Sequence, residues 1–271
     1  NGLSNESGVV GRYLMDSTGC NVPGFFPQLV DRPPYNEDGV GGAHIYIPWF
    51  GYDQKLDFAR GYHLEVWGGR TMPGYGFMGG LQSYNGRIND SANTPRPNGS
   101  GGYGLELKND YRRLFGSRAG FSARGEMIAR YENHCAIDPN VVDRFGIPVL
   151  RFDVTFSDEE LNQMKHAQTA ARELIEAMGG VPLTPMPTRE EGYGIEAPGR
   201  IIHEVGAVRM GNDPKKSALN KWSQAHDSKT LFCVDGGQFV SQGDKNITWT
   251  ILALSMRASE YIVDQMKKQN I

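Results

Sequence analysis

The sequence is poor in several features that mark common classes of protein. It has only three cysteines in 271 residues, at positions 20, 135 and 233. They are too few and too far apart for a disulfide framework or a zinc-binding pattern. No apolar run of about 18 residues occurs, which argues against a membrane-spanning helix. The net charge is only −3, and because no basic stripe is present, nucleic acid is a poor candidate for a partner.

Glycine, by contrast, is abundant. The chain has 35 glycines, whereas average usage would give about 19. Many backbone positions must therefore lie in turns or pass close to another group. Residues 83–104 are polar and rich in Gly, Pro, Asn and Ser, which predicts a long surface loop. This loop is either an excursion near a substrate entrance or a disordered segment.

The pattern of apolar residues predicts an α+β fold. Ser157, with Glu160 three positions later, forms a capping-box signature for a helix that ends at Gly179 and Gly180. We expect an antiparallel sheet of about six strands with helices on one face. Strands are predicted, from alternation of apolar residues, at 44–50, 62–67, within 119–137 and at 149–156.

The C-terminal region differs in character. Residues 231–234 (LFCV) form a short apolar run that is typical of a strand buried on both faces. Residues 247–268 then predict an amphipathic helix. A parallel strand needs neighbours reached by crossover connections, and no preceding βαβ units supply them. We therefore expect this strand and helix to complete a sheet whose other strands lie elsewhere.

Three local features could carry chemistry. His203, in HEVGAVRMG, is a candidate general base because imidazole titrates near neutrality, although a structural histidine is the alternative. Asp235, in VDGG, could meet a ligand hydroxyl or simply form a tight turn. Asn246 opens the last helix, either as an N-cap or at a helix N-terminus suited to a developing anion. The other histidines have no metal-ligand spacing and are expected to be structural.

Taken together, these segments resemble the glucose-methanol-choline (GMC) family of flavin-dependent oxidoreductases. The 43 positions from His203 to Asn246 are similar to the interval between that family's two active-site residues. Within the family, the likeness is greatest to bacterial sugar dehydrogenases, including those that oxidise the C3 hydroxyl of glucosides. The matching segments are 7–16, 119–150, 203–214, Asn220, His226, 231–237 and 246–262.

The resemblance implies a role for each of the two active-site positions. His203 would take the hydroxyl proton of the substrate while the carbon-bound hydride goes to FAD. Asn246 would hydrogen-bond the same substrate oxygen. The implied substrate is a sugar or a glycoside. Trp49 and Tyr52 lie next to glycines and are candidates for stacking on a sugar ring, whereas most other aromatics are expected in the core.

The resemblance also implies the cofactor contacts. Asp235 and Gly236 would meet the ribityl-pyrophosphate part of FAD. The backbone N–H groups of Ile247 and Thr248 would face the flavin pyrimidine edge and stabilise negative charge on the reduced ring. The family's Gly-x-Gly-x-x-Gly fingerprint is absent, because the glycines in 74–80 follow no buried strand and open no helix. FAD is thus expected in the complete enzyme and not on this chain alone.

The sequence departs from the family pattern at three further positions. Ser17 stands where the family has His, Ala207 where it has Thr, and Gly237 where it has Ser. These departures bear on whether the chain retains activity. We therefore keep two functions open. One is the C-terminal part of a sugar dehydrogenase, and the other is a non-catalytic carbohydrate-binding or structural subunit.

The resemblance divides the chain into three parts. Residues 1–24 would be a linker that follows a missing FAD-binding half. Residues 25–225 would form the substrate-binding domain, and 226–271 a strand-helix remnant of the FAD-binding domain. We expect a partner chain that carries the FAD domain, or self-association through the apolar face of the last helix. The family resemblance favours a periplasmic location, with a cytoplasmic one as the alternative.

Overall fold

The computed structural model of the protein describes residues 4–33, 45–48, 51, 54–68, 112–114 and 116–271. The strands are β1 (Arg12–Met15), β2 (Thr18–Phe25), β3 (Ile45–Ile47), β4 (Tyr62–Gly68), β5 (Arg118–Gly125), β6 (His134–Val142), β7 (Pro148–Asp153), β8 (Val181–Pro182) and β9 (Val205–Ala207). The α-helices are α3 (Asp158–Ala177) and α4 (Thr248–Lys267), and the 3-10 helices are η1 (Pro27–Leu29), η2 (Gly192–Gly194) and η3 (Gly236–Gln238). None of these helices is long and apolar enough to cross a membrane.

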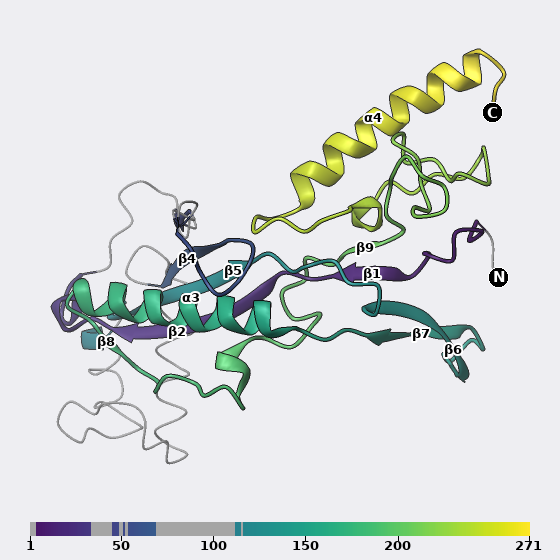
Figure 1. Ribbon diagram of the computed structural model, residues 1–271. Coiled ribbons are helices and arrows are strands. Elements are labelled where there is room, and N and C mark those ends of the chain that lie inside the picture. The colour runs from purple at the N-terminus through teal and green to yellow at the C-terminus, as the bar shows by residue number, and fades with distance from the viewer. Residues whose placement is uncertain (1–3, 34–44, 49–50, 52–53, 69–111, 115) are drawn as a thin grey trace.

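A five-stranded antiparallel sheet, in the order β3-β4-β5-β2-β8, forms the larger layer of the molecule. Helix α3 packs against β2, β4, β5 and β8 along one face of this sheet (Figure 1). The main core lies between the two and includes Val22, Phe121, Met164 and Ile175. Each of these side chains is at most 2% exposed. The predicted arrangement of a sheet with a helix on one face is therefore present.

Helix α3 begins where the sequence predicts. The carboxylate Oε2 of Glu160 accepts hydrogen bonds from both the backbone N–H and the hydroxyl of Ser157, each at 2.6 Å. The Oε1 atom of Glu160 accepts from the backbone N–H of Ile128 at 2.9 Å. Arg130 forms an ion pair with Oε2 at 2.9 Å. Glu160 is only 1% exposed. One carboxylate thus caps the helix and fastens it to the segment after β5.

A second, four-stranded sheet has the order β7-β6-β1-β9. Only Asp16 and Ser17 separate β1 from β2, so the chain passes from one sheet to the other at this point. Strands β1 and β9 approach closely, because a Cβ atom on Gly206 would lie 2.1 Å from the carbonyl oxygen of Tyr13. Gly206 also has a φ of +92°, which favours glycine. The joint between the sheets is the place where His203 is held.

Two details of the predicted architecture are corrected. The described residues form two antiparallel sheets, whereas the sequence predicted one sheet of about six strands. The apolar run 231–234 makes only an isolated bridge, from Phe232 to Gln224, and Leu231 and Val234 are 38% and 37% exposed. A short apolar run indicates a buried strand only if neighbouring strands are present to pair with it. Here the run lies along the surface.

Helix α4 forms as predicted but is apart from the main core (Figure 1). Among its residues only Ala258 is fully buried. Large apolar side chains are exposed along it, at Trp249, Leu252, Met256, Val263 and Met266. These exposed side chains are not, apart from Met266, those of the stripe predicted to face inward, because Ile251, Leu254, Tyr261 and Ile262 are half-buried. The division of the chain at 24 and 225 stays a prediction, although β1 and β2 show that the first part contributes strands to both sheets.

Candidate active site

His203 is held by the two residues that join the sheets. Its backbone N–H donates to Oδ1 of Asp16 at 3.0 Å, while the other oxygen of Asp16 accepts from Gly199 N–H at 3.0 Å. Its ring nitrogen Nδ1 lies 3.2 Å from the hydroxyl oxygen of Ser17. Asp16 and Ser17 are 2% and 1% exposed. The backbone and the ring of His203 are thus fixed by buried partners, and Nε2 is the nitrogen left to meet a ligand.

The surroundings of His203 favour a neutral imidazole. Burial lowers the pKa of His203 below its ordinary value, and the charge of Arg124 lowers it further. The carboxylates of Asp16, Glu65 and Glu204 oppose this without reversing it. A neutral imidazole has a free lone pair at neutral pH, so it can accept a proton.

Gln242 links His203 to the loop that precedes α4. Its amide Nε2 donates to the Ser17 hydroxyl at 2.8 Å. The side chain is buried, at 1% exposure, and its Oε1 has no hydrogen-bond partner within the described part of the chain. The hydroxyl of Ser17 thus lies between Gln242 and the ring of His203. The segment from Gln242 to Asn246 starts beside one predicted site residue and ends at the other.

Asn246 does not cap helix α4. The helix begins at Thr248 with Ile247 as N-cap, and no side chain hydrogen-bonds the exposed N–H groups of its first turn. The Oδ1 of Asn246 instead accepts a hydrogen bond from the phenol of Tyr46 on β3 at 3.2 Å. This orientation leaves the Nδ2 donors on the opposite side of the carboxamide. The capping explanation for Asn246 is therefore wrong.

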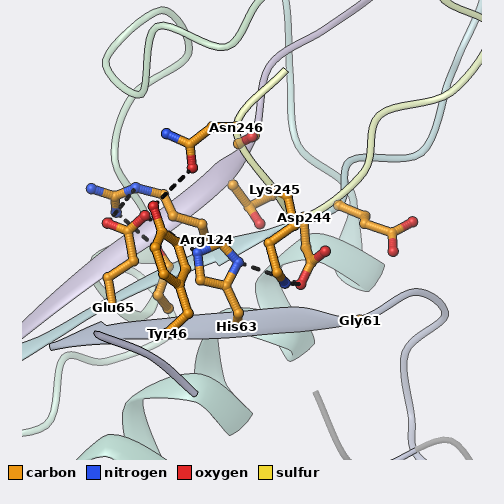
Figure 2. Close-up of polar contacts among 12 residues, drawn as sticks. Tyr46, Gly61, His63, Glu65, Arg124, Asp244, Lys245 and Asn246 are labelled. Atoms are coloured by element: carbon orange, nitrogen blue, oxygen red, sulfur yellow. Dashed lines mark hydrogen bonds and ion pairs between the residues drawn. The ribbon is translucent and has the colours of Figure 1, made fainter. Parts of the chain in front are cut away.

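The two predicted residues approach the same pair of charges. Arg124 Nε and Glu65 Oε2 are 4.0 Å apart on neighbouring strands. Both charges influence the pKa of His203, and both also influence the pKa of Tyr46, whose phenol donates to Asn246. Figure 2 shows Tyr46, Glu65 and Arg124 beside Asn246. No direct contact between His203 and Asn246 is present among the described residues. The described contacts connect them only indirectly, through Ser17 and Gln242 to the segment that ends at Asn246.

The predicted cofactor residues lie in two places. Asp235 forms a tight turn, in which its Oδ1 accepts from Gly237 N–H at 2.8 Å and from the thiol of Cys233 at 3.2 Å. Gly236 packs closely, since a Cβ atom there would lie 3.0 Å from the carbonyl oxygen of Glu204. The turn alternative for VDGG is thus realised, and it leaves Asp235 exposed at the surface.

The start of α4 suits an acceptor-rich group. A cavity of about 350 Å³ is lined there by Asn246, Ile247, Thr250 and Leu254, together with Met210. The first N–H groups of an α-helix have no partner within the helix, and its N-terminus carries partial positive charge. Because no side chain caps α4, these donors fit the carbonyl-bearing pyrimidine edge expected of a flavin.

A second cavity, of about 390 Å³, also reaches this region. Its lining is polar and includes Gln54, Arg60, Glu126 and Asp244. Arg60 and Glu126 form an ion pair at 3.7 Å. Trp49 and Tyr52, the predicted sugar-stacking residues, lie outside the described residues, as does the predicted loop 83–104.

Sequence reasoning missed the polar groups that surround Asn246. They are Tyr46 on β3, His63 and Glu65 on β4, and Asp244 (Figure 2). The alternation within 62–67 was the available signal, because residues two apart on a strand share a face. It could have placed His63 beside Glu65. Nothing in the sequence placed Asp244 against them.

Comparison with known proteins identifies similar families and relatives. Residues 132–255 match the GMC oxidoreductase family. The chain is 28% identical over 96% of its length to 2-methyl-1,2-propanediol dehydrogenase of Mycolicibacterium austroafricanum, covering 43% of that protein. It is 26% identical over 98% of its length to the fructose dehydrogenase large subunit of Gluconobacter japonicus, again covering 43%. Residues 132–255 are thus similar to the GMC oxidoreductase family, and the relatives of the chain include bacterial sugar and alcohol dehydrogenases.

Solved structures share the fold. Formate oxidase of Aspergillus oryzae RIB40 superposes with a TM-score of 0.59 at 13% identity, over 96% of this chain and 48% of that one. Pyridoxine 4-oxidase from Mesorbium loti gives a TM-score of 0.51 at 14% identity, over 93% of this chain and 43% of that one. The chain therefore spans less than half the length of the relatives that it matches.

Proposed function

We propose that this chain supplies the proton acceptor and the substrate-holding surface of an FAD-dependent enzyme that oxidises a CH–OH group of a sugar or glycoside. The observation that carries the proposal is the hydrogen-bonded link from His203 through Ser17 and Gln242 to the segment that ends at Asn246. One residue can accept a proton, and the other can donate hydrogen bonds. Alcohol oxidation needs both abilities at one oxygen atom.

His203 acts as the general base. In the tautomer whose Nδ1–H donates to the Ser17 hydroxyl oxygen, Nε2 carries the free lone pair and takes the proton of the substrate hydroxyl. Partial burial keeps the ring neutral before the reaction. FAD, when bound, supplies the chemistry of hydride acceptance from the substrate carbon. The two electrons leave with that hydride, and the proton stays on the imidazole.

Asn246 holds the same oxygen. Because its Oδ1 accepts from Tyr46, the Nδ2–H groups are the ones that can donate to the alkoxide-like oxygen as negative charge develops. Donors that are fixed before the reaction stabilise such charge more than mobile water does. Tyr46 therefore orients the carboxamide in the sense that the reaction requires.

The FAD contacts would come from this chain in part. The N–H groups of Ile247 and Thr248 at the uncapped start of α4 would face the flavin pyrimidine edge, and Asp235 and Gly236 would lie along the rest of the cofactor. A glycine-rich dinucleotide-binding segment must be contributed by the remainder of the protein or by a partner chain. The 271 residues alone are then expected to bind FAD negligibly.

A polyhydroxylated substrate is supported by two observations. Several relatives are named for sugars or sugar acids, including fructose dehydrogenase and the gluconate 2-dehydrogenase flavoprotein of Pantoea cypripedii, which is 25% identical over 99% of this chain. The polar cavity near Asp244, with Arg60, Glu126 and Gln54, offers charged and amide groups that suit sugar hydroxyls. We further propose Trp49 and Tyr52 as stacking residues for the sugar ring.

Substitution of the base in the complete enzyme tests the proposal. His203→Ala should reduce kcat by about 100-fold to 10,000-fold, since general-base catalysis contributes about that much. The measurement is reduction of an artificial electron acceptor over a panel of sugars and glycosides. His134→Ala is the matched control, because the ring of His134 hydrogen-bonds only the backbone of Glu132 among the described residues.

Two results would overturn it. Turnover that survives His203→Ala would exclude His203 as the base. A complete protein without bound flavin that still binds glucosides in calorimetry would show the non-catalytic carbohydrate-binding function instead.

A further inference from the structure

His63 lies at the centre of a polar cluster beside Asn246 (Figure 2). Its side chain is fully buried, and it points from β4 toward the loop before α4. Nε2 is 3.3 Å from Oε1 of Glu65, two residues along the same strand face. Nδ1 is 3.3 Å from Oδ2 of Asp244, as an ion pair without the alignment of a hydrogen bond. Both ring nitrogens therefore face a carboxylate.

This arrangement fixes the protonation of the ring. A neutral imidazole carries one N–H donor and one lone pair, whereas an imidazolium carries two donors. Ionised carboxylates only accept hydrogen bonds. A neutral His63 would direct a lone pair at one carboxylate, and only the imidazolium satisfies both Glu65 and Asp244. Two carboxylates within 3.3 Å of its nitrogens thus favour a positive charge on this buried ring.

The remaining charges around the ring balance this cation. Arg124 lies directly opposite His63 on β5, and Lys245 contacts Asp244. The phenol ring of Tyr46, from β3, has its centre 5.0 Å from that of His63. Glu126, near the end of β5, lies close enough to Asp244 to feel its charge. Arg60 in turn pairs with Glu126, so three cations and three carboxylates surround the imidazolium and its partners.

The pKa directions agree. Burial by itself lowers the pKa of His63, but the contacts with Asp244 and Glu65 outweigh it, so the pKa lies above its ordinary value. Burial likewise raises the pKa of Asp244, yet the contacts with His63 and Lys245 bring it below its ordinary value. Each partner therefore stabilises the charged form of the other.

The cluster connects β4 to the segment that ends in Asn246. Asp244 precedes Asn246 by two residues, so its ion pair with His63 fastens that segment to the five-stranded sheet. Tyr46, which lies opposite Glu65 in the register of β3 and β4, holds the carboxamide of Asn246 directly. Both contacts with Asn246 thus start from neighbouring strands of one sheet.

We infer that His63, as an imidazolium held between Glu65 and Asp244, is a positioning residue that fixes Asn246 for its contact with the substrate oxygen. The inference rests on the role proposed above for Asn246. His63 itself touches neither substrate nor cofactor. It acts through Asp244, by holding the end of the loop at the distance from which Tyr46 can orient the carboxamide.

The sign of the pH dependence follows from the raised pKa. The imidazolium bridge is fully present below the ordinary pKa of histidine, and it is lost as the pH rises through the higher pKa of the folded protein. The orientation of Asn246 should therefore loosen in alkaline solution. The pKa of His203 is shifted in the opposite direction. Because it is lowered, His203 loses its proton at a lower pH than His63 does.

Nuclear magnetic resonance of the 271-residue chain tests the inference without any activity. The side-chain nitrogens of His63 and the carboxamide of Asn246 are followed as a function of pH. We expect His63 to titrate above its ordinary pKa and the Asn246 signals to move with it. Asp244→Asn, which keeps the shape of the side chain, should shift the His63 titration downward and broaden or shift the Asn246 signals at neutral pH.

Asp264→Asn is the matched control. Asp264 is exposed on α4 and pairs with Lys268, far along the helix from the cluster. Its replacement should therefore change neither the titration of His63 nor the signals of Asn246. His63→Gln serves as a second variant only if it folds. The inference is overturned if the Asn246 signals are indifferent both to the His63 titration and to Asp244→Asn, or if His63 titrates at or below its ordinary pKa.

Kinetics of the complete enzyme separate this inference from the proposed function. Asp244→Asn should lower kcat up to about 100-fold, the order expected for a misplaced reacting group. In this variant, the decrease of kcat on the alkaline side of the pH profile should begin at a lower pH. If Asn246→Ala leaves turnover intact, the proposed function fails while the resonance coupling can still hold. If Asn246→Ala abolishes turnover but Asp244→Asn changes neither signals nor pH profile, only the inference on His63 fails.

Discussion

The five-stranded sheet with α3 and the C-terminal segment 231–271 contain apolar residues in similar patterns, but bury them to very different extents. Phe121, Met164 and Ile175 in the first region are at most 2% exposed, whereas Trp249 and Met256 in the second are 84% and 64% exposed. The first region has its packing partners within this chain. The second presents an apolar face that the described part of the chain leaves exposed. An apolar pattern therefore predicts an element and its face, but not the partner that covers this face.

The largest expected effect is on the core of the sheet. Phe121→Ala should lower the free energy of unfolding by about 3–5 kcal/mol, because a buried aromatic ring is lost and a cavity remains. Trp249→Ala removes an even larger side chain, but from an exposed position. This variant should change the free energy of unfolding by less than about 0.5 kcal/mol. Denaturation by urea, followed by circular dichroism, measures both. Similar losses for the two variants would remove the contrast between the regions.

The fold was predictable where local signals agree with the tertiary contacts. The start of α3 is one such case, since Ser157 and Glu160 form the capping box that their spacing predicts. The run 231–234 is the opposite case. Its residues fit a buried strand, but pairing depends on neighbours that the described chain does not provide. The join at Asp16 and Ser17, which splits the strands into two sheets, has no signature in apolar periodicity.

The candidate site divides in the same way. The positions of His203 and Asn246 followed from an ordered motif, and the roles given to them remain proposals. The polar cluster around His63 depends on sheet register, which places Arg124 opposite His63 and Tyr46 opposite Glu65. Register arises from the pairing of strands that are far apart in sequence, so no local pattern could have indicated it.

A smaller effect is expected from the cap of α3. Glu160→Gln removes a buried charge that receives hydrogen bonds from Ser157 and Ile128 and pairs with Arg130. Hydrogen bonds to charged groups contribute about 1.5–3 kcal/mol, so the free energy of unfolding should fall by about that amount. Thermal unfolding at neutral pH, with the exposed Glu132→Gln as control, checks the value.

The same variant has a pH signature. Burial raises the pKa of Glu160, but the hydrogen bonds from Ser157, Ile128 and Arg130 bring it below its ordinary value. The stability that it contributes is therefore present above the ordinary pKa of glutamate, and is lost as the pH falls through the lower pKa of the folded state. The difference between wild type and Glu160→Gln should shrink in acid. A difference that is constant down to low pH would show that Glu160 acts through packing alone.

The smallest effect on folding, and the sharpest on association, is expected at α4. Its exposed apolar residues at 249, 252, 256, 263 and 266 follow helical spacing and so lie on one stripe. We propose that this stripe causes self-association of the chain.

Trp249→Ser with Met256→Ser should weaken that association at micromolar concentration, as measured by sedimentation velocity. Because both side chains are exposed, the unfolding free energy should change by no more than about 1 kcal/mol in total, apart from the small loss of helix propensity. The exposed polar pair Ser259→Ala and Glu260→Gln on the same helix is the control. A wild-type chain that sediments as a monomer at micromolar concentration would show that the uncovered stripe does not recruit a second copy, and would leave the remainder of the oxidoreductase as its partner.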